Sequence, residues 1–260
     1  MAIVTFWNNN TGKIGQTHSA LAIAMHMGLE HNYKTLLMST RYNDQVIMQS
    51  FGINERVATV KSLTNNAKAM DLESGLEGMA KLAAANRLEP GMVPNYTTII
   101  LKDRLEVVAA PKKKEDADYD RIYRACRSIL TVAKNYYDII FIDLNNGFSE
   151  ATTKEILKMS NIIILNMEQK PSEIEKLLKL RENTELFPPK QTLALINNYD
   201  RKSKYSTKNI SREIGDRKEM LSVPYCIYQL FALKSHLLLN LYILFLDIHL
   251  YFLLVLILLK

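Results

Sequence analysis

The sequence predicts an α/β fold in which a doubly wound, mostly parallel sheet carries helices on both faces. Short apolar runs rich in β-branched residues alternate with stretches of helical periodicity along the first 224 residues. Several of these runs, such as residues 138–143 (DIIFID), are continuously apolar, as expected for central parallel strands that are buried on both faces. A chain of 260 residues is long enough for one sizeable domain of this kind plus an appendage.

The individual elements follow from apolar runs and from apolar residues at helical spacing. Glycine and proline, as in Pro90-Gly91 and at Pro111, mark several of the boundaries. The predicted strands are residues 3–7, 35–39, 104–110, 138–143, 161–165 and 192–196. The predicted helices are residues 20–29, 43–51, 72–88 and 120–136, and the charged run 112–120 is interpreted as a solvated loop and helix start.

Residues 2–18 (AIVTFWNNNTGKIGQTH) combine a short strand, a loop with glycines at 12 and 15, and the start of a helix. This arrangement points free backbone N–H groups at a phosphate, and the helix dipole adds to the attraction. His18 by itself is more often an exposed residue than a catalyst. The predicted phosphate-binding residues are Thr11, Gly12, Lys13, Ile14, Gly15, Gln16, Thr17 and His18.

The spacing of this loop resembles the altered P-loop of the ParA/MinD family of partitioning and cell-division ATPases, whose motif reads K-G-G-x-G-K-T-T. Gly12, Gly15 and Thr17 match the motif. The resemblance extends to about residue 224 in the order of its landmarks: phosphate loop, second strand, third strand, acid-bearing strand and base strand. It implies a P-loop NTPase fold of the SIMIBI type that binds ATP and Mg²⁺ and switches by nucleotide-dependent homodimerisation.

Two further landmarks follow from the resemblance. Asp143 ends the predicted strand 138–143, and in P-loop proteins an acid there holds Mg²⁺, directly or through water. Thr17 is the second predicted metal ligand, and Gly147 matches the glycine of the following switch loop. Asn197, in the segment LALINNYD, stands where the family reads the adenine edge. The alternatives are that Asp143 merely ends a strand and that Asn197 is a turn residue.

Several residues depart from the family pattern. Gln16 stands where P-loop NTPases carry the lysine that contacts the β- and γ-phosphates, and Thr11 replaces the signature lysine that reaches across the dimer. Ser39 and Arg41 stand where the family usually has an Asp-x-Asp pair, although Asp44 lies close by. A lost lysine removes a charge-assisted contact of about 1.5–3 kcal/mol, and more where charge develops in the transition state. We therefore expect weak or absent ATP hydrolysis.

Lys13 lies on the same loop and is a candidate for supplying the missing phosphate-facing charge. The competing interpretation is that its side chain points to solvent. Lys13 and Asp44 are the candidate catalytic residues of an ATP hydrolase, should the protein be an enzyme at all.

The chain carries a formal net charge of +6, which permits contact with DNA or an anionic membrane but proves neither. Residues 200–218 (DRKSKYSTKNISREIGDRK) are strongly basic. ParA-type proteins bind DNA without sequence preference, so these residues are a candidate DNA-binding segment; a solvated loop and helix face is the alternative. The candidate DNA-binding residues are Arg201, Lys202, Lys204 and Lys208.

Composition changes abruptly after Pro224, which predicts a division into a nucleotide-binding domain, residues 1–224, and a hydrophobic tail, residues 225–260. Residues 237–259 are almost entirely Leu, Ile, Phe, Tyr and Val, and their length suits a membrane span of about 20 residues. A tail anchor would leave the domain at the cytoplasmic face of the membrane. An aberrant reading frame, or a helix buried in a partner, would give a similar composition.

The sequence thus favours a ParA/MinD-like ATP-binding partitioning or positioning protein in the cytoplasm, with little or no hydrolysis. The two cysteines, Cys126 and Cys226, have no spacing for metal or redox chemistry and fit a reducing compartment. The alternatives are a non-catalytic scaffold that binds no nucleotide and a non-specific DNA-binding module. The sequence leaves the protein partner unspecified.

Overall fold

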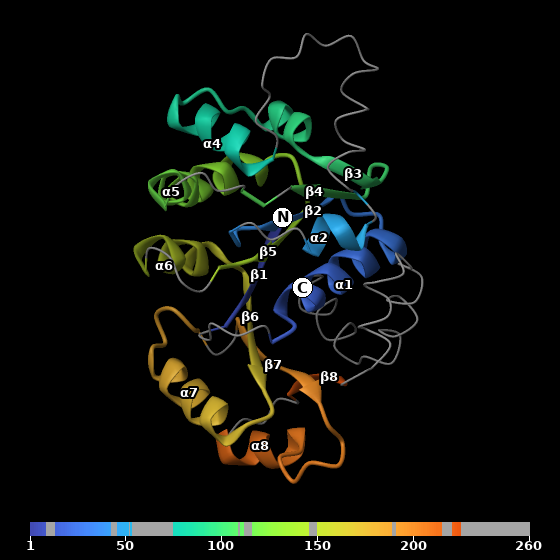
Figure 1. Cartoon of the computed structure of the whole chain (residues 1–260), viewed down its shortest axis with the longest axis vertical. Helices are drawn as coiled ribbons and strands as arrows, with labels where there is room; N and C mark the ends of the chain where they lie inside the picture. The colour runs from blue at the N-terminus through green and yellow to red at the C-terminus, as the bar shows by residue number, and fades with distance from the viewer. Residues whose placement is uncertain are drawn as a thin grey trace.

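The computed structural model describes residues 1–8, 14–42, 46–51, 53, 75–108, 110–111, 116–145, 150–188, 191–214 and 220–224. These residues form an eight-stranded sheet in the order β3-β4-β2-β5-β1-β6-β7-β8, with helices on both faces (Figure 1). Every pair of neighbouring strands is parallel except β3 and β4. The predicted doubly wound, mostly parallel fold is therefore confirmed.

The elements alternate along the chain as expected for such a fold. The strands are β1 (Ala2–Trp7), β2 (Thr35–Ser39), β3 (Thr98–Leu101), β4 (Leu105–Val108), β5 (Ile139–Asp143), β6 (Ile162–Glu168), β7 (Thr192–Tyr199) and β8 (Leu221–Pro224). The helices are α1 (Gln16–Glu30), α2 (Val46–Ser50), α4 (Leu76–Ala84), the 3₁₀ helix η1 (Pro90–Tyr96), α5 (Asp116–Ala133), α6 (Glu150–Met159), α7 (Pro171–Glu182) and α8 (Thr207–Ile214).

Two hydrophobic layers sandwich the sheet. Helices α1 and α2 cover one face, and α4, α5, α6, α7 and α8 lie on the other (Figure 1). Because successive side chains of a strand point to opposite faces, Ile139 and Phe141 of β5 join the layer under α1, whereas Ile140 and Ile142 join the layer under α5. Burial on both faces explains why the central strands are continuously apolar in sequence.

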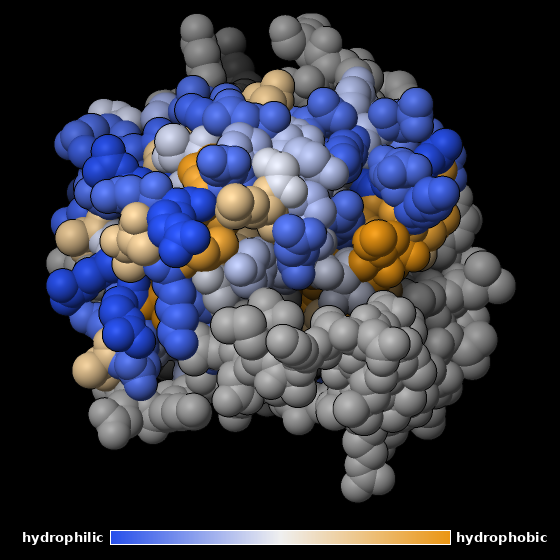
Figure 2. Space-filling model, turned by 90° about the horizontal axis from the view of Figure 1, so that it is seen from above, coloured by the Kyte–Doolittle hydropathy of each residue, from blue (hydrophilic) through white to orange (hydrophobic). Residues whose placement is uncertain are grey.

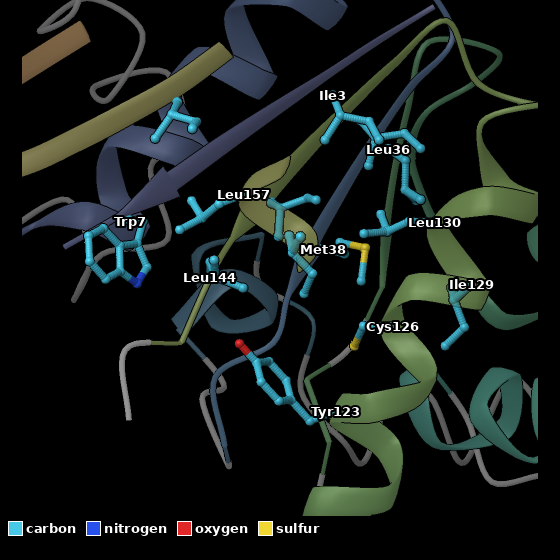
Figure 3. Close-up of a cluster of buried hydrophobic side chains, with 14 of the residues drawn as sticks. Ile3, Trp7, Leu36, Met38, Tyr123, Cys126, Ile129, Leu130, Leu144 and Leu157 are labelled. Atoms are coloured by element: carbon cyan, nitrogen blue, oxygen red, sulfur yellow. The ribbon is translucent and has the colours of Figure 1, made fainter. Parts of the chain in front are cut away.

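Helix α5 packs its apolar side against the middle of the sheet. The side chains of Cys126 and Leu130 lie between the helix and β2, which carries Leu36 and Met38 (Figure 3). Cys126 is 0% exposed, and burial raises the pKa of its thiol from 9.0 to about 12. The thiol is thus kept protonated and serves as a small apolar group of the core.

The six strands predicted from the sequence are present, β2 with its predicted bounds and the other five with shifted ends, and two further strands appear. Strand β3 pairs antiparallel with β4 at the edge of the sheet, where Ile99 is 63% exposed. Strand β3 is short and partly exposed, so its sequence lacks the continuous apolar run of a buried strand. Neither β3 nor β8 was among the predicted strands. Of the predicted helix 72–88, residues 72–74 lie outside the described chain, and the rest is helical only over α4, Leu76–Ala84, which ends four residues before the predicted end.

The face seen from above in Figure 2 is mainly hydrophilic, with apolar side chains in separate patches. Among the residues that the structure describes, no helix is both long and apolar enough to cross a membrane. The predicted tail, residues 225–260, lies outside those residues. Both the domain boundary at 224 and the tail anchor therefore stay predictions.

Candidate functional site

Polar side chains meet at the carboxyl ends of β2, β5, β1, β6 and β7, the edge where open α/β sheets place their ligands. The strand register brings them together: Phe6 of β1 and Ser39 of β2 both lie opposite Asp143 at the end of β5. Helix α1 starts directly above this edge. Sequence-distant residues thus form one cluster because parallel strands end at the same side of the sheet.

Gly15 is the residue that turns the chain from the loop into α1. Its φ of 84° lies in the left-handed region, which glycine adopts at no steric cost. A Cβ at this position would stand 3.6 Å from Asn197, so the space itself is not the constraint. The first turn of a helix leaves backbone N–H groups without an intrahelical partner, and Gly15 aims this turn at the carboxyl edge.

The side chain of Gln16 points into the protein and is 1% exposed. Its Nε2 lies 2.6 Å from Oδ1 of Asp143, 2.9 Å from the carbonyl of Leu144 and 3.0 Å from the carbonyl of Phe6. Its Oε1 accepts a hydrogen bond from Asn8 at 2.5 Å. An amide nitrogen has only two N–H groups, so these protein acceptors use its whole donor capacity. The side chain of Gln16 thus connects α1 to β1 and β5 through hydrogen bonds.

Asp143 is 0% exposed and accepts hydrogen bonds on both carboxylate oxygens. Besides Gln16, Oδ1 accepts from Nε of Arg41 at 3.2 Å. Oδ2 accepts from the hydroxyl of Thr17 at 2.7 Å and from that of Ser39 at 3.3 Å. The Arg41 contact is an ion pair in which the arginine side chain is 19% exposed. A buried carboxylate requires such compensation because an isolated buried charge is strongly unfavourable.

This donor set does not fit a directly bound Mg²⁺. A carboxylate offers about four lone-pair directions, and donors of four residues approach those of Asp143: Gln16, Arg41, Thr17 and Ser39. A metal ion at either oxygen would have to displace one of them. Among the described residues, no group of three or more His, Cys, Asp or Glu side chains is placed to hold a metal. Thr17 and Asp143, the two predicted metal ligands, are joined by a hydrogen bond, and their role toward Mg²⁺ stays a prediction.

Asn197 lies near the end of β7, 2% exposed, and both ends of its amide are bonded. Its Nδ2 donates to Oδ1 of Asn166 at 2.9 Å, and its Oδ1 accepts from the hydroxyl of Ser19 at 2.9 Å. Ser19 also donates to the carbonyl of Gly15 at 3.2 Å. Asn197 therefore connects β6, β7 and α1, and adenine recognition by Asn197 stays a prediction.

Tyr119 of α5 connects the loops that follow β2 and β5. Its hydroxyl donates to the carbonyl of Thr40 and accepts from Nδ2 of Asn145 at 3.2 Å. The backbone N–H of Asn145 in turn donates to the hydroxyl of Thr40 at 2.8 Å. Burial raises the pKa of Tyr119, which keeps its hydroxyl protonated and able to donate.

The remaining predicted residues divide between described and undescribed parts of the chain. Ile14 is buried and His18 is half-buried. Four basic residues, Arg201, Lys202, Lys204 and Lys208, are exposed in the loop after β7 and on α8. Five predicted residues lie outside the described part of the chain: Thr11, Gly12, Lys13, Asp44 and Gly147.

Sequence reasoning missed several members of the cluster. Asn8, Asn166, Ser19 and Tyr119 carry hydrogen bonds that hold its elements together. The available signal was a polar residue at or near the end of an apolar strand, as at Asn8 after β1 and Asn166 within β6. Ser19 and Tyr119 give no such signal, because their roles arise from helix packing.

The described arrangement is similar to solved ATPases of partitioning and cell division. A ParA family ATPase from Chlorobium tepidum is 14% identical, with a TM-score of 0.68 over 95% of this chain and 92% of that one. A plasmid partition protein from Borrelia burgdorferi bound to AMPPNP is 16% identical, with a TM-score of 0.61 over 95% of this chain and 98% of that one. The septum site-determining protein MinD of Pyrococcus horikoshii, complexed with Mg-ADP, is 13% identical, with a TM-score of 0.62 over 90% of this chain and 86% of that one.

At these identities the likeness shows the fold, which is that of ParA- and MinD-type P-loop ATPases. No protein-family model matches the sequence, and a search of curated proteins found no match. The fold implied by the loop spacing is thus confirmed.

Proposed function

We propose that this protein is a ParA/MinD-like partitioning or positioning protein that hydrolyses ATP weakly or not at all. The observation that carries the proposal is the inward side chain of Gln16. The lysine of a P-loop reaches the β- and γ-phosphates with a positive charge. Gln16 brings no charge, is 1% exposed, and donates to acceptors of the protein itself. Transition-state stabilisation by this side chain is therefore absent.

ATP is the proposed ligand because the backbone features that bind phosphate remain. Gly15 aims the N-terminus of α1, a helix of 15 residues, at the carboxyl edge of the sheet. A helix N-terminus attracts anions through free N–H groups and its dipole. The similar Borrelia protein is bound to AMPPNP and the similar Pyrococcus protein to Mg-ADP. We propose that nucleotide binding switches the chain between monomer and homodimer.

The deciding experiment is a calorimetric titration of ATP into the full-length protein, together with an assay of phosphate release. We expect heat of binding, with phosphate release that is weak and close to that of an Asp143→Asn variant. Strong turnover that the Asp143→Asn variant lacks would contradict the proposal. Sedimentation with and without AMPPNP then tests the switch, for which a shift from monomer to dimer is expected and an unchanged mass is contrary evidence.

Lys13 is proposed as the residue that supplies a phosphate-facing charge. Lys13→Ala should weaken ATP binding, whereas Lys102→Ala, in the exposed turn between β3 and β4, should leave it unchanged. Equal ATP affinity of the Lys13→Ala variant and wild type would remove Lys13 from the site.

A non-catalytic scaffold that binds no nucleotide is the second candidate. Its support is that the polar cluster is bonded without any ligand: Gln16 and Asp143 have protein partners at both ends of the amide and on both carboxylate oxygens. Absence of heat at millimolar ATP, from a protein that circular dichroism shows to be folded, would favour this candidate. Partner proteins would then be the object of search.

A further inference from the structure

We propose that Arg41 is a built-in counter-ion that takes the place of a divalent cation at Asp143, so that this site works without metal. This proposal rests on the proposed function only for the location of the nucleotide site. It concerns the residues that compensate the buried charge of Asp143. Arg41 follows β2 closely, and Ser39 at the end of β2 lies opposite Asp143 in the sheet. The topology alone therefore delivers a cation to the carboxylate.

The contact geometry makes Arg41 part of a closed shell around the acid. Nε of Arg41 approaches Oδ1, the oxygen that also accepts from Gln16, while Oδ2 accepts from Thr17 and Ser39. The backbone N–H of Arg41 donates to the Ser39 hydroxyl at 3.2 Å, which fixes the start of the side chain relative to β2. Arg41 is thus fixed both at its backbone and at its side chain, and its guanidinium has a defined position beside the carboxylate.

Charge excludes a second cation from the same place. Asp143 is 0% exposed, so its negative charge requires a partner, and the guanidinium supplies one positive charge that persists at every physiological pH. A divalent ion at Oδ1 or Oδ2 would face this charge at close range and would lose a hydrogen-bonded donor. Removal of Arg41 should allow a divalent cation to approach Asp143, because a hard divalent cation stabilises a buried carboxylate.

The test is thermal unfolding of the full-length protein without nucleotide, in millimolar MgCl₂ or MnCl₂ and in EDTA. Wild type should unfold at the same temperature in all three. The Arg41→Ala variant should unfold roughly 10 °C lower in EDTA, because it removes a cationic partner of a buried carboxylate, and Mg²⁺ or Mn²⁺ should restore part of the loss. The double variant Arg41→Ala/Asp143→Asn should respond to neither metal.

Arg124→Ala is the matched control, because Arg124 forms an exposed ion pair with Asp120 at 2.7 Å. It should unfold like wild type with and without metal. Two results would overturn the proposal: a metal-dependent rise in the wild-type transition that Asp143→Asn abolishes, or an Arg41→Ala variant that loses stability with no rescue by metal. The second result would leave Arg41 as a structural ion pair only.

Should Arg41→Ala fail to fold, binding of Mn²⁺ to wild type and to Asp143→Asn, followed by electron paramagnetic resonance, decides the question. An undiminished signal of free Mn²⁺ with both proteins supports the proposal, and Mn²⁺ binding by wild type alone overturns it. Strong ATP hydrolysis in the earlier assay would contradict the proposed function, whereas these measurements without nucleotide test the role of Arg41 independently.

Discussion

Gln16 and Asp143 are joined directly, with Nε2 of the glutamine 2.6 Å from Oδ1 of the aspartate. One residue begins α1 and the other ends β5, so this hydrogen bond closes the helix onto the sheet. The side chain of Gln16 is therefore used for a contact inside the protein, and under the proposed function the same contact keeps it from reaching a phosphate.

Gln16→Ala should lower the free energy of unfolding by about 2 kcal/mol, since it removes a buried amide that donates to two carbonyls and to Oδ1 of Asp143 and that accepts from Asn8. Thermal unfolding followed by circular dichroism measures the loss. Gln169→Ala is the control, because Gln169 bonds to the carbonyls of Asp200 and Tyr205 near the surface and should cost about 1 kcal/mol or less. Equal losses for the two variants would contradict the role given to Gln16.

Gly15→Ala should destabilise the protein by about 1–2 kcal/mol, because a Cβ is strained at a φ of 84°. Its nearest neighbour would be Asn197 at 3.6 Å, which is ordinary contact, so backbone strain alone is measured. Gly91→Ala is the control: nothing lies within 4 Å of its Cβ position, and urea unfolding should find it within about 0.5 kcal/mol of wild type. A neutral Gly15→Ala would show that the turn does not require glycine.

Tyr119→Phe should loosen the loops after β2 and β5, because it removes the hydroxyl that bonds to Thr40 and Asn145. Hydrogen exchange measured by mass spectrometry should become faster in peptides that contain residues 40 and 145. Tyr123→Phe removes a buried hydroxyl that bonds to Thr153 instead, and it should leave exchange in those peptides unchanged. Identical exchange in both variants would exclude a specific connection through Tyr119.

Stability should fall as pH rises above about 9, because burial raises the pKa of Cys126 from 9.0 to about 12. Between these values the unfolded chain releases a thiol proton that the folded chain retains, so the unfolded state is favoured increasingly with pH. One such group contributes a slope of up to about 1.4 kcal/mol per pH unit. Urea unfolding between pH 8.5 and about 9.5, where tyrosines of the unfolded chain, with a pKa near 10, only begin to ionise, measures the slope.

Cys126→Ala should flatten that slope, even though the variant is less stable at neutral pH. Ile129→Val is the matched control, because Ile129 lies on the same helix, is 0% exposed and carries no titratable group. The control should keep the wild-type slope. A Cys126→Ala variant with an unchanged slope would show that other groups govern the alkaline loss.

The exposed basic segment after β7 gives a test of DNA binding. Replacement of Arg201, Lys202 and Lys204 by Glu should weaken retention on DNA at low salt and reduce the salt dependence of binding, by about one unit of slope for each lost phosphate contact. The control replaces three exposed arginines of α5 by Glu, with the same change in charge: Arg121, Arg124 and Arg127. Equal effects would indicate net charge, and no effect would favour a solvated loop.

The order of six strands and of helices α1, α2, α4 and α5 followed from the sequence, and the strands were recognisable because the central ones are buried on both faces. Runs such as 138–143 must be apolar throughout to occupy that position, and this property is local and readable. Strand β3 could not be predicted in the same way, since it is a short edge strand with exposed side chains such as Ile99. Helices α6, α7 and α8 are apolar on one side only, which is a weaker signal in the sequence than a strand that is apolar throughout.

The sequence by itself determined that Asp143 ends an apolar run, and its resemblance to ParA and MinD proteins placed Gln16 at the P-loop lysine and Ser39 and Arg41 at the expected acids. Only the tertiary structure decided where these side chains point. The parallel register places the ends of β2 and β5 at one edge of the sheet, next to the start of α1. There the buried carboxylate of Asp143 accepts hydrogen bonds from Gln16, Thr17 and Arg41. Compensation of a buried charge depends on every neighbour in space, and no local pattern in the sequence contains those neighbours.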